Sequence, residues 1–165
     1  MKEKQRYCDV NWLKLVSQLA PKHNKLAIIV GEDVSEVIFD DDCVTVDLNI
    51  YLTQALLNIA VSKRPIKLVG ILGDIFRKQA SPYIMLFGLE VLFEPSLQIQ
   101  VVDLLKQLSH NITIVVIWPG DFYLMERGGK LSYSQLWHAE YQDYTITVRD
   151  DFEVIPYQTF IKDTA

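Results

Sequence analysis

Residues 112–118 read ITIVVIW, a continuous run of apolar and mostly β-branched side chains. Two similar runs precede it, LAIIV at 26–30 and YIMLF at 83–87. Short apolar runs of this kind are typical of strands that are buried on both faces, as in parallel sheets. A further strand is predicted for CVTVDL at 43–48. These four runs decide the fold class.

Helical patterns lie between the strands and before the first of them. Residues 10–20 predict an amphipathic helix, residues 49–61 a second helix, and residues 66–79 a third one that two internal glycines make less regular. Pro95 is predicted to open a fourth helix that runs through Leu108. The inward side of the second helix is expected to hold Ile50, Leu52, Leu56, Leu57 and Ala60. The fourth helix is expected to bury Leu97, Val101, Leu104, Leu105 and Leu108.

The pattern changes after residue 120. Gly128-Gly129 predicts a turn between short extended pieces, TITV at 145–148 predicts a last strand, and the tail from about Asp150 has no clear pattern. Strands that alternate with helices indicate parallel βαβ units with right-handed crossovers. We therefore predict one α/β domain over residues 1–165. It is a three-layer sandwich around a mainly parallel sheet of about five strands, with the strand–helix plan of a P-loop NTPase.

The composition indicates a globular chain. Half of its 165 residues are hydrophobic and 22% are charged, which excludes the disordered class. The net charge of −5 argues against a general nucleic-acid binder. The two cysteines form no CxxC pair, and no apolar run approaches the roughly 20 residues of a membrane helix. Because no signal-peptide pattern follows the N-terminus either, we expect a cytoplasmic protein without membrane association.

The loop after the first strand, GEDVSEVIFDDD at 31–42, decides whether ATP binds. In a P-loop enzyme this place carries GxxxxGK(S/T), whose N–H groups and lysine bind phosphates and whose hydroxyl binds Mg²⁺. GEDVSEV has no second glycine, no lysine and no Ser or Thr at the required step, and its carboxylates would repel a triphosphate. The acidic run does not match an EF-hand either. We therefore expect no cofactor and no metal at a degenerate loop that comprises Gly31, Glu32, Asp33, Val34, Ser35 and Glu36.

The segment after the third strand, GLEVLFEP, contains the one candidate for catalysis. A Walker B strand ends in an acidic residue that helps to hold Mg²⁺. Here the apolar run continues through Phe87 to Gly88, and the first carboxylate is that of Glu90. Glu90 could polarise a water molecule, but it could equally cap a neighbouring loop or form a salt bridge with it, and we favour this structural interpretation.

Two further groups could form interaction surfaces. Trp118, Phe122 and Tyr123 follow the fourth strand, where they predict an aromatic platform for a base or a partner, or else part of the core. A basic group brackets the third helix, and it is either a positive edge that faces nucleic acid or an acidic partner, or a solvated helix face. It comprises Lys63, Arg64, Lys67, Arg77 and Lys78.

Three blocks resemble BrxF, the small P-loop-type protein of type 3 BREX phage-defence systems. They are VDLNIYLTQALLNI followed by KRPIKL, LEVLFEPSL leading into DLLKQLSHNITIVVIWPG, and LSYSQLWHAEYQDY. The resemblance as a whole covers roughly residues 25–148. That family usually has a full Walker A motif and an acidic residue that ends the third strand. In this chain Phe87 and Gly88 stand where the third strand of the family ends in an acidic residue, while Glu90 matches a glutamate of the family.

The resemblance implies a role in bacterial phage defence. The partners it implies are a DNA methyltransferase, a helicase-type ATPase and a phosphatase-like protein, with DNA contacted indirectly. Our first hypothesis is a non-catalytic interaction subunit that has kept the ATPase sheet. The second is an atypical nucleotide-binding ATPase or switch in which Glu90 and Asp33 handle the metal. The third is a DNA-binding accessory protein that uses the basic group, and a homo-oligomer stays open for all three.

Overall fold

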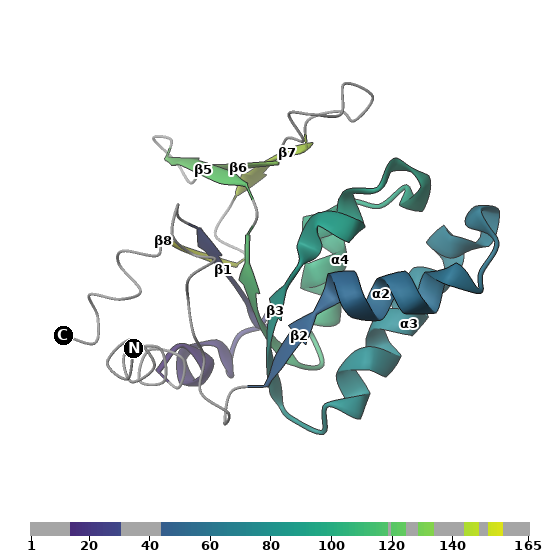
Figure 1. Ribbon diagram of the computed structural model, residues 1–165. Coiled ribbons are helices and arrows are strands. Elements are labelled where there is room, and N and C mark those ends of the chain that lie inside the picture. Colours follow the sequence, from purple (N-terminus) through teal and green to yellow (C-terminus); the bar gives the residue numbers. More distant parts are fainter. Residues whose placement is uncertain are drawn as a thin grey trace, which may run out of the picture.

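The structure, a computed structural model, describes residues 14–30, 44–118, 120–124, 129–133, 144–148 and 152–156. Its centre is a five-stranded sheet made of β1 (Leu26–Val30), β2 (Thr45–Asp47), β3 (Tyr83–Phe87), β4 (Thr113–Ile117) and β8 (Glu153–Pro156). The strand order is β2-β3-β4-β1-β8, and every neighbouring pair is parallel (Figure 1). The predicted α/β class and five-stranded parallel sheet are therefore confirmed.

Helices cover both faces of this sheet. One face carries α2 (Leu48–Leu57), α3 (Arg64–Lys78) and α4 (Val101–Leu108), with the short helices η2 (Val61–Lys63), η3 (Leu89–Phe93) and η4 (Pro95–Leu97) between them. The helical residues 14–19 lie on the other face, which gives three layers (Figure 1). The predicted residues 10–13 of that first helix lie outside the described residues. Nowhere in the described part of the chain is a helix both long and apolar enough to cross a membrane.

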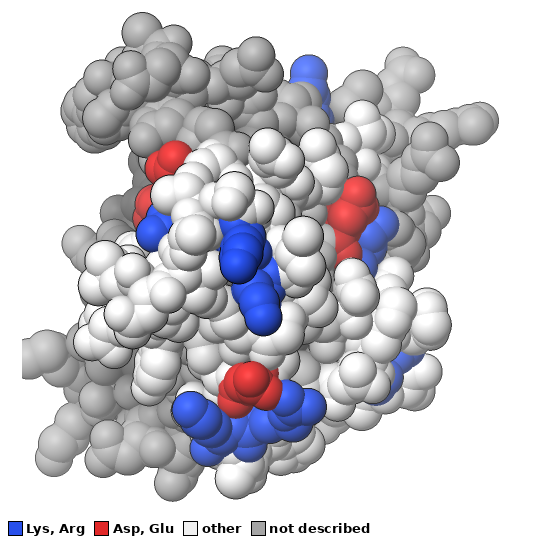
Figure 2. All heavy atoms as spheres, turned by 90° about the vertical axis from the view of Figure 1, so that its right-hand side faces the viewer, with Lys and Arg blue, Asp and Glu red and all other residues white. Residues whose placement is uncertain are grey.

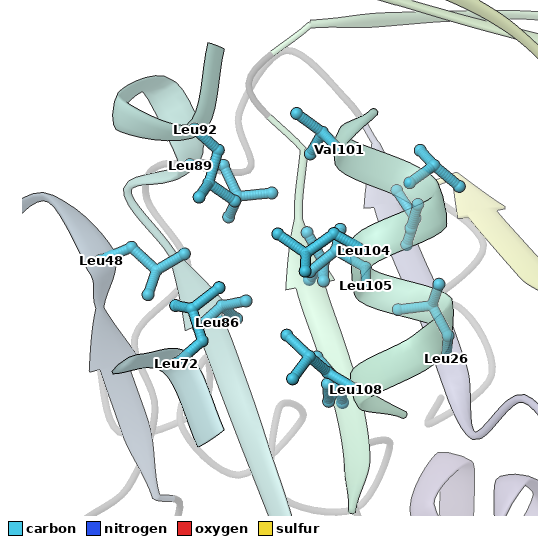
Figure 3. Close-up of a cluster of buried hydrophobic side chains, with 14 of the residues drawn as sticks. Leu26, Leu48, Leu72, Leu86, Leu89, Leu92, Val101, Leu104, Leu105 and Leu108 are labelled. Carbon is cyan, nitrogen blue, oxygen red and sulfur yellow. The ribbon is translucent and has the colours of Figure 1, made fainter. Parts of the chain in front are cut away.

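The core has one cluster on each face because successive side chains of a strand point to opposite sides. Leu26, Ile28 and Val30 of β1 pack toward α2, α3 and α4, while Ala27 and Ile29 pack toward residues 14–19. All five residues of β1 are buried. Figure 3 shows the larger cluster between α4 and the strands, where leucines of α3, β3, η3 and α4 meet.

A second sheet lies beyond the carboxyl ends of the parallel strands (Figure 1). It is antiparallel and comprises β5 (Asp121–Leu124), β6 (Gly129–Tyr133) and β7 (Tyr144–Val148). Leu131 and Val148 belong to the larger core cluster, so the small sheet packs onto the main body. The TITV segment is a strand as predicted, but it belongs to this small sheet. The fifth strand of the large sheet is β8, in the tail where no pattern was visible.

Two predicted boundaries are wrong for local reasons. The segment 43–48 was predicted as one strand, yet Leu48 begins α2 because the Asp47 side chain caps that helix. Within the helix predicted from Pro95, residues 95–97 form η4 and α4 begins only at Val101. Gln98 interrupts the two with a φ of +52°, a left-handed conformation that cannot continue an α-helix.

The predicted inward side of α2 is also wrong in part. The helix buries Leu48, Leu52 and Leu56, which recur at every fourth position. Ile50 and Leu57 are exposed instead, and Ala60 lies exposed beyond the end of the helix. Because apolar residues occur all around α2, the pattern did not decide which of them face the sheet. The inward residues predicted for 95–108 are all buried.

Candidate functional site at the carboxyl edge of the sheet

The strand order places a topological switch between β1 and β4. The chain leaves β1 for β2 at the far edge of the sheet, whereas it leaves β4 for the small sheet and then for β8, on the other side of β1. The two neighbouring strands therefore connect in opposite directions. In open α/β sheets, ligands bind in the crevice outside the carboxyl ends of the strands at such a point.

β1 ends at this edge, and the loop that follows it lies outside the described residues. Val30, its last described neighbour, is buried at the end of β1. The degenerate loop from Gly31 to Glu36 therefore stays a prediction from the sequence.

At the end of β4, Trp118 joins the two sheets. Its side chain is 1% exposed, and its indole Nε1 donates a hydrogen bond to the carbonyl oxygen of Ser132 in β6 at 2.9 Å. The ring of Phe93 packs edge-on against it, with 5.6 Å between the ring centroids. A Cβ at Gly120 would lie 1.8 Å from that same carbonyl oxygen of Ser132, so β5 starts in close contact with β6. The indole is therefore part of the core, and it offers no free face to a base.

The other two residues of the predicted aromatic platform lie on β5. The backbone of Phe122 pairs with that of Leu131, and the backbone of Tyr123 pairs with that of Lys130. The backbones of Phe122 and Tyr123 thus belong to the small sheet that follows β4, whereas Trp118 lies at the end of β4 itself.

The ends of β2 and β3 meet in a second polar group. Asp47 Oδ1 accepts a hydrogen bond from the backbone N–H of Asn49 at 3.0 Å, which caps α2. The Asn49 side-chain amide donates to Glu90 Oε2 at 3.2 Å. Gly88 has a φ of +69°, and a Cβ there would lie 2.3 Å from Asp47 Oδ1. Glu90 therefore links η3 to the first turn of α2 by a hydrogen bond, which is a structural contact of the kind favoured from the sequence, although its partner is a neutral amide and not a cation.

Asp47 and Asn49 were not among the predicted site residues. An Asp directly before a helical pattern is an N-cap signal, so the sequence contained a clue to Asp47. The contact between Asn49 and Glu90 joins residues 41 positions apart, and no local pattern predicts it. Within the described ranges, no three His, Cys, Asp or Glu residues come close enough together to hold a metal ion.

The predicted basic group consists of two arginines whose side chains form contacts and three exposed lysines. Arg64 Nε donates to the carbonyl oxygen of Ile59 at 3.0 Å, and Arg77 pairs with Asp74. Both arginine side chains therefore have partners within or directly before α3. Lys63, Lys67 and Lys78 are exposed, and none of their side chains forms an ion pair or hydrogen bond with another described residue.

Comparison of the chain with protein-family models, with curated proteins and with solved structures finds no match.

Proposed function

We propose that this chain is a non-catalytic, P-loop-like interaction subunit of a BREX anti-phage defence complex in bacteria. The sequence blocks that resemble BrxF support the defence role. The strand order supports the P-loop-like plan, because the acidic GEDVSEV loop follows a central strand at the switch point.

The observation that most supports a non-catalytic role is the contact between Trp118 and Ser132. At the end of β4, the indole of Trp118 and strand β6 fill the space beside the switch point. Glu90, the catalytic candidate named from the sequence, accepts a hydrogen bond from the side-chain amide of Asn49. Asp47 adds a second carboxylate at the same edge, so the charge of the described side chains there does not favour a triphosphate.

A subunit of this kind acts through its surface. The partners that the resemblance implies are a DNA methyltransferase, a helicase-type ATPase and a phosphatase-like protein. The chain would contact DNA through them, and it would act in the cytoplasm, where these partners meet phage DNA.

The test is phage plating on cells that carry the whole defence system. Deleting the gene for this chain is expected to restore plating, and the wild-type gene supplied in trans to suppress it again. Glu90→Ala and Asp33→Ala are expected to protect as well as the wild type, because the proposed role needs no metal-binding carboxylate.

Two outcomes contradict the proposal. If deletion leaves protection intact, the chain has no role in defence. If Glu90→Ala or Asp33→Ala abolishes protection while the variant still accumulates and folds, the atypical ATPase takes the place of the interaction subunit.

A further inference from the structure

Helix α3 has two apolar stripes, and only one of them faces the sheet. Its buried stripe consists of Leu68, Leu72, Ile75 and Phe76. A second stripe consists of Ile66, Val69, Gly70 and Gly73, which have the i, i+3, i+4, i+7 spacing of one helix face. Ile66 is 85% exposed and Val69 is 37% exposed. We call this second stripe the outer stripe.

The outer stripe lies in the part of the chain that holds most of the exposed large hydrophobic residues. Six of the seven exposed large hydrophobic residues in the described part of the chain lie between positions 50 and 69, on α2, η2 and α3. They are Ile50, Tyr51, Leu57, Val61, Ile66 and Val69. Figure 2 shows this side of the molecule, where uncharged residues predominate and both basic and acidic side chains lie among them. Concentrated exposed apolar residues mark interaction sites, whereas scattered ones do not.

The two glycines leave the outer stripe without side chains at positions 70 and 73. A Cβ added at Gly70 or Gly73 would meet no atom within 4 Å, so no neighbouring side chain requires glycine at either position. Glycine weakens an exposed helix relative to alanine, so the pair does not serve the stability of α3. What it does permit is the close approach of a second backbone.

A hollow lies at one end of the outer stripe. Its volume is about 500 Å³, and its apolar wall includes Phe76, Leu108 and Ile112. Gly73 lines the hollow and also belongs to the stripe, so the two surfaces are continuous. The hollow is large enough to take one bulky apolar side chain.

Lysines line one flank of the outer stripe. Residues three and four apart are neighbours on a helix, so Lys63 lies beside Ile66, and Lys67 lies beside both Lys63 and Gly70. Lys78 continues this flank one turn beyond Asp74, whose carboxylate is paired with Arg77. The flank is therefore positively charged, and its lysines are not paired within the described residues.

We propose that the outer stripe and its hollow bind an acidic amphipathic helix of a partner protein. Carboxylates along one side of that helix pair with Lys63, Lys67 and Lys78, and one bulky apolar side chain fills the hollow beside Gly73. The outer stripe extends about 10 Å along α3 from Ile66 to Gly73, and the hollow continues it to Phe76, so that the two together span about 15 Å and match roughly three turns of a bound helix. The proposal rests on the proposed function, since the partner is a protein of the same complex.

A nucleic acid fits this face less well. Phosphate binding favours basic and polar side chains throughout the contact, whereas Ile66 and Val69 lie in the middle of this one. DNA and a second copy of the chain are therefore outcomes that the experiment must separate from a partner helix.

The first experiment replaces Ile66 in the tagged full-length chain with a photo-cross-linking residue, in cells that carry the whole defence system. Mass spectrometry then identifies the cross-linked peptide. We expect one partner protein and a segment with apolar residues at helical spacing and Asp or Glu along one side. A basic segment, DNA, a second copy of this chain or the absence of any adduct would each overturn the proposal.

The second experiment reverses the charge of the flank and measures the partner that stays bound to the purified chain. The double variant K63E/K67E is expected to retain about tenfold less partner, because like charges then face each other. The matched control K14E/K130E changes the net charge equally at two exposed lysines outside α2, η2 and α3. Full retention by K63E/K67E would overturn the docking face and leave the proposed function standing. If even the wild type retains no partner and its deletion does not change phage plating, both fail.

Discussion

Asp47 and Gly88 hold the ends of two neighbouring strands together. The Asp47 carboxylate caps α2, and Gly88 passes so close to it that no side chain fits between them. The left-handed φ of Gly88 also excludes most other residues on steric grounds. This one pair fixes where β3 turns into η3 and thus where Glu90 meets Asn49.

We predict that Gly88→Ala lowers the free energy of unfolding by about 2 kcal/mol. The left-handed backbone costs about 1 kcal/mol for a residue with a Cβ, and displacing the Asp47 cap costs about as much again. Urea denaturation followed by circular dichroism measures the change. An unchanged denaturation midpoint would contradict the close contact between Gly88 and Asp47.

The strands could be predicted from the sequence because each is buried on both faces. LAIIV, YIMLF and ITIVVIW are apolar without interruption, a pattern that points to the centre of a parallel sheet. β8 is only four residues long, lies at the edge and contains a proline, so it carries no such pattern. The small sheet was predicted only as extended pieces, because its pairing depends on contacts between segments far apart in the chain.

The position of the site could be predicted from the sequence, whereas the contacts within it could not. Loops after parallel strands meet at one edge, so the sequence placed Glu90 and Trp118 there correctly. That the indole of Trp118 donates to Ser132 depends on how β6 folds back over the edge, and no local pattern decides this. Which residues of α2 face the sheet could not be predicted either, because a helix with apolar residues on all sides has no single inward face.

Helix α3 is weakened by the glycines of its outer stripe. We predict that Gly70→Ala and Gly73→Ala each raise the free energy of unfolding by about 0.5–1 kcal/mol, because alanine has the higher helix propensity and the added methyl groups meet open space. The same urea titration applies, and Gly88→Ala is the matched substitution with the opposite sign. A loss of stability at both positions would show that the surface of α3 is not open there.

The whole molecule combines a parallel sheet with a smaller sheet over its carboxyl edge. β8 returns to pair with β1, and the ion pair between Lys22 and Glu153 lies beside that pairing. The small sheet is held over the end of β4 by the Trp118 contact, next to the switch point where a nucleotide would bind in a P-loop ATPase. Our central proposal is that the fold keeps the strand–helix plan of a P-loop ATPase and binds a partner protein through the outer stripe of α3.

The most direct test is calorimetric titration of the purified chain with Mg·ATP and with Mg·ADP up to millimolar concentration. We predict no binding heat for either nucleotide, because the loop after β1 lacks the phosphate-binding lysine and carries carboxylates instead. Binding of micromolar strength would contradict it, and the phosphate site would then have to be sought at the Gly31–Glu36 loop and Glu90.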